Sequence, residues 1–191
     1  PKGCMLNPQY PAAVVAGNVE TSQVVTDTLF GALQVMGASQ GTMNNFTFGN
    51  ERYQNYETIC GGSGAGPGYD GTSAVHTHMT NTRLTDPEIL EWRFPVRLES
   101  FSIREVSGGA GEFRGGNGSV RKVRFLEPMI AAILSNHRRI APYGMAGGEP
   151  GKVGETYVLR VDGSRTELGA QGQTDVVAGD MMVIETPGGG G

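Results

Sequence analysis

The sequence predicts an α+β fold that is rich in antiparallel sheet, barrel- or sandwich-like, with one long N-terminal helix and glycine-rich loops. The helix is predicted from apolar residues that recur at helical spacing over 19–36. The sheet is predicted from short segments after residue 95 in which polar and apolar residues alternate. The loops are predicted from the 31 glycines, which cluster between apolar segments at 61–71, 108–118, 144–154 and 188–191.

Near the N-terminus, the apolar run at 11–16 predicts a short buried strand. Asn18 is the predicted N-cap of the helix, and Glu20 lies in its first turn, where the helix dipole favours negative charge. Gly37 is predicted to end this helix. Its apolar positions are Val25, Leu29, Ala32, Leu33 and Met36.

The middle of the chain alternates loops with short elements. Residues 38–50 are expected to form a loop that leads into a strand, and residues 56–60 a strand that enters the glycine loop at 61–71. A second helix is predicted to open at Pro87, with a capping box between Thr85 and Glu88, and to stop at Pro95.

The second half is predicted to be mainly antiparallel sheet. Polar residues Arg97, Glu99, Ser102 and Arg104 interleave with Leu98, Phe101, Ile103 and Val106. Further strands are expected at 119–126, 129–135, 155–161 and 181–186, with glycine turns at 115–118 and 162–163. We therefore divide the chain into a helix-containing part with the glycine and histidine loops (1–94) and an antiparallel β part (95–191). Together they are expected to form one compact unit, a fragment of a longer subunit.

Composition excludes several classes of partner. The formal net charge is −4, so no basic field exists to hold nucleic acid or an anionic membrane. No apolar run approaches the length of a membrane span, and the N-terminus lacks a secretion-signal pattern. Cys4 and Cys60 do not form a CxxC pair, and two reduced cysteines fit a cytoplasmic protein.

The densest polar stretch is residues 75–83, directly after the glycine loop. In a strand, His76 and His78 would point to the same face, where two imidazoles can bind one metal or serve as a base beside a hydrogen-bonding partner. A cupin metal site would need a carboxylate four or five residues later, where Thr82 and Arg83 stand instead. Metal binding, a structural hydrogen-bond network and a catalytic role all remain open at this stage.

The glycine loop at 61–68 could present backbone N–H groups to an anion. It lacks the ending of a P-loop, and no helix-like segment follows its GxGxxG match, so a tight structural loop is the favoured interpretation. Arg104 and Arg114 are candidates to bind a carboxylate, with surface ion pairs as the alternative. No GxSxG elbow marks a nucleophile, and Ser39, Ser63 and Cys60 are weak candidates.

Four phrases resemble the hydantoinase B/oxoprolinase family. They are residues 16–23 (AGNVETSQ), 38–45 (ASQGTMNN), 76–83 (HTHMTNTR), and 107–111 (SGGAG) with 114–118 (RGGNG). Their order and spacing also match, and together they cover the chain almost end to end. The family includes B subunits of N-methylhydantoinase, the corresponding half of 5-oxoprolinase and α-type subunits of acetone carboxylase.

The resemblance implies the C-terminal region of the B subunit of an ATP-dependent cyclic-amide hydrolase. An A-type partner subunit or domain would bind ATP and phosphorylate the substrate, and the B part would support opening of a five-membered lactam or imide ring. A divalent metal is expected in the longer subunit, at a site outside this chain. The substrate stays open between a hydantoin, 5-oxoproline and a ketone, and a homo-oligomer is possible.

The matched phrases also carry the candidate site residues. The expected catalytic residues are His76, His78, Asn81 and Arg83. The expected substrate-binding residues are Glu20, Gln23, Gln40, Asn44, Asn45 and Arg114. Two rival functions remain: a small cupin-like metal- or ligand-binding module, and a structural assembly domain of a carboxylase-type complex.

Overall fold

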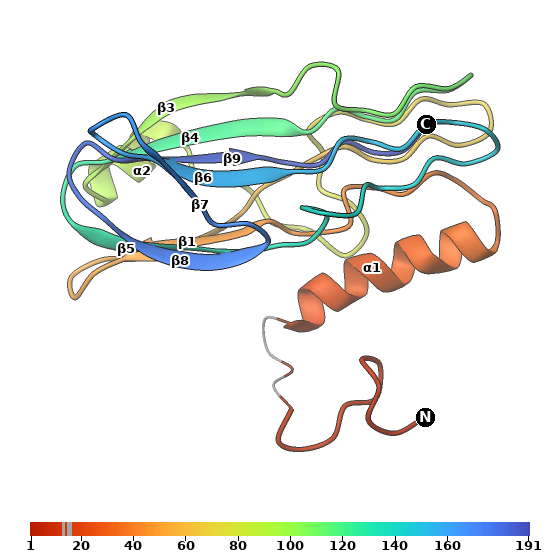
Figure 1. Cartoon of the computed structure of the whole chain (residues 1–191), viewed down its shortest axis with the longest axis horizontal. Helices are drawn as coiled ribbons and strands as arrows, with labels where there is room; N and C mark the ends of the chain where they lie inside the picture. The colour runs from red at the N-terminus through yellow and green to blue at the C-terminus, as the bar shows by residue number, and fades with distance from the viewer. Residues whose placement is uncertain (13, 15–16) are drawn as a thin grey trace.

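In a computed structural model, which describes residues 1–12, 14 and 17–191, two antiparallel sheets lie face to face as two layers (Figure 1). The first sheet has the strand order β2-β1-β5-β8 and the second the order β3-β4-β9-β6-β7. The first half of the chain supplies α1 (Gly17–Ala32), β1 (Asn45–Gly49), β2 (Gln54–Thr58) and α2 (Pro87–Arg93). The second half supplies β3 (Val96–Ile103), β4 (Ser119–Phe125), β5 (Met129–Leu134), β6 (Glu155–Leu159), β7 (Arg165–Glu167), β8 (Gln171–Val176) and β9 (Met181–Glu185).

The hydrophobic core lies between the two sheets. Alternation places every second residue of β4 inward, and the same period orients β5. Phe48 is at the centre, with the rings of Phe46, Phe94 and Phe125 at centroid distances of 5.3, 5.7 and 5.8 Å. A buried ion pair also joins the sheets, because Arg121 of β4 donates twice to the Glu57 carboxylate of β2, at 2.9 Å each. We call this half of the molecule the sandwich.

Beyond the strands, glycine-rich segments lie side by side. We call segments 61–66, 107–118, 144–151 and 187–191 the glycine bundle (right side of Figure 1). Backbone hydrogen bonds link them. Ala65 N donates to Gly190 O at 2.9 Å, Gly116 N to Ser63 O at 2.8 Å and Gly189 N to Gly116 O at 2.9 Å. The segments approach so closely that a Cβ at Gly62 would overlap backbone atoms, which explains the glycine clusters in the sequence.

The predicted antiparallel sheet is confirmed, whereas a closed barrel is absent from the described part of the chain. Strands β4, β5, β6 and β9 fall within the predicted segments. Strands β7 and β8 are not among the predicted segments. β7 has only three residues, and β8 (QGQTDV) is almost entirely polar, so neither shows the alternation of polar and apolar residues that predicts a strand. In β3 the register shifts between Leu98 and Ser100, so Glu99 forms a bulge. This bulge explains why the polar positions change from odd to even numbers along that strand.

The N-terminal elements differ from prediction. Helix α1 starts at Gly17, so Asn18 is within the helix and not at the position before it. It ends at Ala32, well before Gly37. Val35 N donates to Phe30 O and Gln34 N to Gly31 O, and Gln34 has φ of 54°. These bonds form a Schellman cap with a left-handed glutamine at the position usually held by glycine.

Two further local predictions need correction. Of the strand expected at 11–16, residues 13, 15 and 16 lie outside the described part, and residues 11, 12 and 14 are exposed and not in a strand. Helix α2 is capped by Asp86, whose side chain accepts from Glu88 N at 3.0 Å, and not by Thr85. Pro87 is in the first turn of α2, as predicted, and the helix ends before Pro95.

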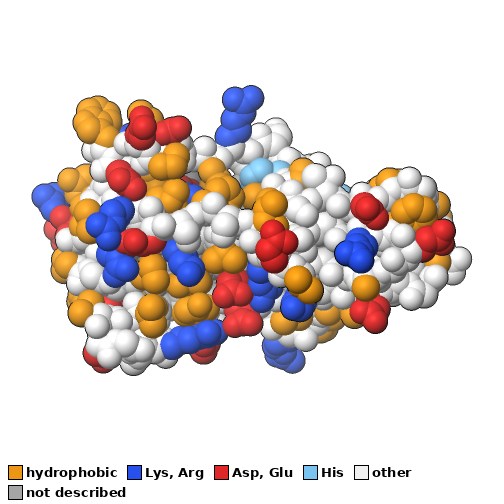
Figure 2. Space-filling view, turned by 90° about the horizontal axis from the view of Figure 1, so that it is seen from above, with side chains coloured by type: hydrophobic (Ala, Val, Ile, Leu, Met, Phe, Trp, Pro, Cys, Tyr) orange, Lys and Arg blue, Asp and Glu red, His pale blue; other side chains and the backbone are white. Residues whose placement is uncertain are grey.

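The surface carries interspersed charges. Figure 2 shows basic and acidic side chains mixed across one face of the molecule, with no continuous basic area on that face. Ion pairs account for part of this mixing, such as Arg124 Nε with Glu99 Oε1 at 2.6 Å. None of the helices in the described residues has both the length and the apolar character to cross a bilayer.

Candidate active site

Helix α1 buries a polar face. Glu20, Gln23 and Asp27 recur at spacings of three and four, so they lie on one side of the helix, and each is at most 5% exposed. The predicted apolar stripe faces outward instead, with Leu29 55% and Leu33 72% exposed. The polar face packs on residues 39–45, 76–80 and 136–138. We call these buried and half-buried polar side chains the polar cluster: Glu20, Gln23, Asp27, Gln40, Asn44, Asn45, His78, Asn136, His137 and Arg138.

Glu20 accepts hydrogen bonds from three residues in two segments. Its Oε1 accepts from Met43 N at 2.9 Å and Asn45 Nδ2 at 2.7 Å, and its Oε2 accepts from Asn136 Nδ2 at 2.8 Å. Burial raises the pKa of the Glu20 carboxyl, and these hydrogen bonds oppose that rise only in part. Glu20 therefore ties α1 to the start of β1 and the end of β5.

Gln23 holds the histidine segment against α1. Its Nε2 donates to Thr77 O at 3.0 Å and to Thr80 Oγ1 at 2.8 Å, and its Oε1 accepts from Thr77 Oγ1 at 3.0 Å. Because Gln23 is fully buried, these bonds satisfy all of its polar atoms and fix the position of residues 77–80.

His78 and Asp27 form the one imidazole–carboxylate pair among the described residues. His78 Nε2 lies 2.8 Å from Asp27 Oδ1, and the two side chains are 8% and 6% exposed. Ser39 N donates to the same Oδ1 at 3.1 Å. The ring of Phe30 meets the imidazole edge-to-face at a centroid distance of 5.7 Å. The second carboxylate oxygen, Asp27 Oδ2, is buried without a hydrogen-bond partner in the described chain.

Gln40, Asn44 and Arg138 form a second network. Asn44 Nδ2 donates to Gln40 Oε1 at 2.8 Å, and Arg138 Nη2 donates to Asn44 Oδ1 at 2.8 Å. Desolvation lowers the pKa of the Arg138 guanidinium to about 10, although Glu20 favours the charge. This network connects the loop before β1 to the loop after β5.

Several residues of the polar cluster hold uncommon backbone conformations. Asn44, His78 and His137 have φ of 45°, 53° and 51°, in the left-handed region that side chains other than glycine seldom adopt. Gly41 has φ of 62°, and a Cβ there would overlap the His137 ring. Backbone strain of this kind is concentrated at functional sites, where the surrounding structure maintains it.

The remaining predicted site residues are placed differently. His76 and His78 are not in a regular strand and do not share a strand face. Burial lowers the pKa of His76, whose Nδ1 is buried with no hydrogen-bond partner in the residues described. Asn81, Arg83 and Arg114 are exposed. The structure thus gathers His78 with Glu20, Gln23, Gln40, Asn44 and Asn45, and leaves the exposed three apart.

Sequence reasoning missed Asp27, Asn136, His137 and Arg138 as site residues. Asp27 had a readable signal, since it continues the polar spacing of Glu20 and Gln23 on one helix face. The other three follow β5 directly. Only strand pairing between β1 and β5 brings them beside the loop at 39–45, so no local pattern in the sequence could have identified them.

The glycine loop is structural. Backbone N–H groups of Gly62, Ser63 and Ala65 donate to Pro187 O, Thr72 O and Gly190 O, so these donors are not free to bind an anion. The weak nucleophile candidates are also occupied. Ser39 Oγ accepts from Gly64 N and Ser63 Oγ from Thr72 N. Cys60 is buried, and burial raises the pKa of its thiol, which disfavours the reactive thiolate.

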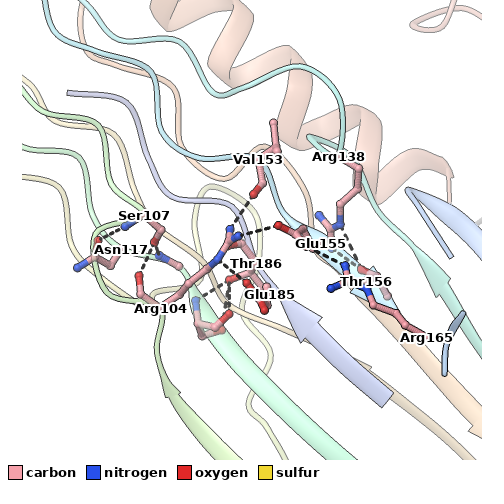
Figure 3. Close-up of polar contacts among 12 residues, drawn as sticks. Arg104, Ser107, Asn117, Arg138, Val153, Glu155, Thr156, Arg165, Glu185 and Thr186 are labelled. Carbon is pink, nitrogen blue, oxygen red and sulfur yellow. Dashed lines mark hydrogen bonds and ion pairs between the residues drawn. The ribbon is translucent and has the colours of Figure 1, made fainter. Parts of the chain in front are cut away.

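Arg104 belongs to an ion-pair network and not to a ligand site. Figure 3 shows its guanidinium between Glu155 and Glu185 and close to two carbonyls. Arg104 Nε lies 2.9 Å from Glu185 Oε2, and Nη1 donates to Val153 O at 2.7 Å. The guanidinium therefore has no free edge for a substrate carboxylate.

The described residues contain no group of three or more His, Cys, Asp or Glu side chains arranged to hold a metal ion. Asp27, His78 and His137 are the nearest approach to such a set within the polar cluster. A groove of about 780 Å³ runs between residues 3–12, Val14 and α1 and extends to Met79. It is lined by Thr21, Ser22, Val25 and Thr26 of α1 and by no residue of the polar cluster, so the acid–base groups lie on the other face of the helix.

Two packed antiparallel sheets, the glycine bundle and the buried Asp27–His78 pair together describe the fold and the candidate site of this chain. The family model for Hydantoinase B/oxoprolinase matches residues 1–191, and the chain belongs to this family.

Relatives and solved structures agree with that assignment. The chain is 51% identical to 5-oxoprolinase 1 of Arabidopsis thaliana over the whole of this chain and 15% of that relative. The ATP-dependent caprolactamase from Pseudomonas jessenii matches with a TM-score of 0.70 at 22% identity, over 96% of this chain and 35% of that one. An acetone carboxylase structure matches with a TM-score of 0.69 at 17% identity, over 85% and 27%. The chain therefore spans about a sixth of the 5-oxoprolinases that it matches.

Proposed function

We propose that this chain is the C-terminal region of the B part of an ATP-dependent hydrolase that opens five-membered cyclic amides. The supporting observation is the buried Asp27–His78 pair in a chain 51% identical to a 5-oxoprolinase. That relative makes 5-oxoproline the first substrate to test, ahead of a hydantoin.

The chemistry explains why such an enzyme needs ATP. An amide carbonyl is a poor electrophile, and phosphorylation of its oxygen makes the carbon susceptible to water. No P-loop occurs in this sequence. An A-type partner subunit or domain would supply the ATP site, and the polar cluster would face the activated ring.

The residues divide into proposed roles. His78 is the proton-transfer group, because it is paired with a carboxylate. Glu20, Gln23 and Asn45 hold the walls of the site, and Gln40 and Asn44 can orient polar atoms of the ring. Asn81, Arg83 and Arg114 are exposed, so we assign them to contact with the partner or to substrate entry. His76 has no partner in the described residues and stays a second proton-transfer candidate.

A divalent metal, if the whole protein uses one, would be held outside this chain. The polar cluster does not fit a metal site, because the described residues hold no group of three or more His, Cys, Asp or Glu side chains arranged around one ion. We also propose a cytoplasmic location, in keeping with the two free cysteines.

The test is an assay of the full-length protein with its ATP-binding component. The substrates are 5-oxoproline, hydantoin and the seven-membered caprolactam, and both ring opening and ADP are measured. Opening of 5-oxoproline that requires ATP supports the proposal. ATP-dependent carboxylation of acetone, with no ring opening, would contradict it.

A further inference from the structure

Asp27 has no role assigned by the sequence, yet it is a buried carboxylate of the polar cluster that contacts a histidine. It is 4% exposed, its Oδ1 accepts from both His78 and Ser39, and its Oδ2 has no partner in the described chain. The Tyr143 hydroxyl donates to the Asp27 carbonyl oxygen, which fixes this turn of α1 as well.

We infer that Asp27 is the positioning residue of a histidine base: its carboxylate fixes the tautomer of His78 so that Nδ1 carries the lone pair that accepts a proton. This inference rests on the proposed function. It adds a residue outside the predicted site and names the reacting atom.

The tautomer follows from the donor and acceptor inventory. An ionised carboxylate accepts hydrogen bonds and donates none, so the His78 nitrogen at 2.8 Å must carry the proton. That nitrogen is Nε2. A neutral imidazole has one protonated nitrogen, so its lone pair is on Nδ1. Nδ1 makes no hydrogen bond to any described residue.

A proton taken up at Nδ1 of His78 would complete an ion pair with Asp27. Asp27 is buried with one oxygen unpartnered, so its negative charge is only partly compensated by hydrogen bonds. A proton on Nδ1 would convert His78 to an imidazolium and complete an ion pair. The other titratable groups that face this pair are Tyr143, through the Asp27 carbonyl, and His137, whose Nε2 lies against Gly41 beside Asp27 Oδ2. His137 Nδ1 donates to Ile140 O at 2.7 Å, so in the neutral form its Nε2 carries no proton for Asp27.

The histidine is held in a defined orientation. His78 has φ of 53°, and Gln23 fixes Thr77 and Thr80 on both sides of it. Phe30 limits rotation of the ring. Positioning of this kind, a base oriented by a third group, is the arrangement that proton-transfer catalysis requires.

The step itself is a proton transfer during hydrolysis. Water bonds through its oxygen to the amide carbon, and His78 Nδ1 takes the proton that this water loses. The carbon–nitrogen bond then breaks, the ring nitrogen keeps the electron pair, and the proton on Nδ1 passes to that nitrogen, which leaves the phosphoryl group on the carbon as an acyl phosphate. A second water breaks the acyl phosphate into a carboxylate and inorganic phosphate, so ring opening and release of the phosphoryl group each take up one water, and His78 returns to its starting state.

The first test reads the tautomer directly. In the full-length protein labelled with ¹⁵N-histidine, wild-type His78 should show a protonated Nε2 and an unprotonated Nδ1 above neutral pH. Asp27→Asn should change this pattern, because an amide can present its NH₂ to the imidazole. A wild-type His78 protonated at Nδ1 would overturn the inference, whatever the activity.

The second test reads proton transfer. Asp27→Asn should lower kcat/KM for ring opening by about 10²-fold or more, with KM little changed. Asp175→Asn, an exposed carboxylate on β8, is the matched control and should stay near wild type.

A double variant separates positioning from folding. In a His78→Gln background, Asp27→Asn should add little further loss, since the base is already absent. An equal loss in both backgrounds would show a structural role and overturn the inference. A wild type that opens none of the rings would count against the proposed function, while the tautomer still decides the role of Asp27.

Discussion

The sandwich and the glycine bundle occupy opposite ends of the same molecule (Figure 1) and are stabilised in different ways. In the sandwich, side chains fill the space between sheets, and Phe46, Phe125 and Val158 are fully buried. In the glycine bundle, backbone hydrogen bonds hold extended segments together, and few side chains lie between these segments. The polar cluster lies beside the bundle, where residues 37–41 hydrogen-bond to the bundle on one side and to Asp27 of α1 on the other.

This difference has a consequence for the site. A core of side chains can repack when one of them changes, because rotamers adjust. Backbone segments in direct contact cannot repack in this way, since each segment is held by backbone hydrogen bonds to two or more neighbouring segments. The bundle is therefore suited to fixing Gly37–Gly41 and the loop at 75–80, and through them the positions of Gln40 and His78.

The largest effect is expected from a side chain in the bundle. Gly62→Ala would place a Cβ against Gly116 O and Gly189 N, so two backbone segments would have to separate. We expect a loss of about 5 kcal/mol or more in the free energy of unfolding, or failure to fold. Urea unfolding measures it.

Gly68→Ala is the control for that substitution. Gly68 has φ of +88° and open space around its Cα, so alanine there meets backbone strain without overlap and should cost about 1 kcal/mol. Equal losses at the two positions would mean that conformational freedom, and not close packing, explains the glycines.

The next largest loss in the free energy of unfolding is expected from a substitution in the core of the sandwich. Phe125→Ala removes a fully buried ring that contacts Phe48, and large-to-small changes of this kind cost about 3–5 kcal/mol. The same unfolding experiment tests it. A loss below about 1 kcal/mol would show that the sheets collapse into the cavity, and that the sandwich core is less well packed than the contacts indicate.

Replacing both partners of the Arg121–Glu57 ion pair, which joins the two sheets, is expected to change the free energy of unfolding by less than these core substitutions. Arg121→Met alone leaves the Glu57 carboxylate buried and unpaired, at a cost of about 3 kcal/mol. Adding Glu57→Leu should recover most of that loss, because two apolar side chains need no partner. A double variant no more stable than Arg121→Met would show that Glu57 does not depend on the arginine.

The smallest expected effect concerns Glu20 and pH. Burial raises the pKa of Glu20 above its ordinary value of 4.5, so the folded state holds this proton more tightly than the unfolded state does. The stabilisation from Glu20 is therefore complete below its ordinary pKa and is lost as pH rises through the folded-state value. Unfolding of wild type and Glu20→Gln, compared between about pH 4 and pH 7, should show wild type losing stability relative to the variant. The opposite slope would mean that hydrogen bonds outweigh burial at Glu20.

Much of the fold could be predicted from local pattern. Alternation identified β4, β5, β6 and β9, because sheet faces impose a period of two on any sequence that packs on one side. The glycine loops were also recognisable as turns and close approaches. The end of α1 was not, because a left-handed Gln34 closes it while Gly37, the expected terminator, lies further on.

The site was only half predictable. Residues in the matched phrases, such as Glu20 and His78, entered through family resemblance, and the structure brings several of them together. Asp27 had a signal in its helical spacing from Glu20 and Gln23, whereas His137 could not be paired with them, because its proximity depends on the pairing of β1 with β5. The buried face of α1 was also predicted wrongly. The apolar stripe of the helix was expected to face the protein, whereas the polar face is buried and makes hydrogen bonds there.

The most direct test of the account is the activity of His78→Gln in the full-length protein assembled with its ATP-binding component. Glu51→Gln, an exposed carboxylate next to β1, is the control. The account predicts that His78→Gln lowers ATP-dependent opening of 5-oxoproline by about 10²-fold or more with assembly unchanged, while Glu51→Gln stays near wild type. Near-normal turnover by His78→Gln would contradict the account and make the polar cluster a structural element.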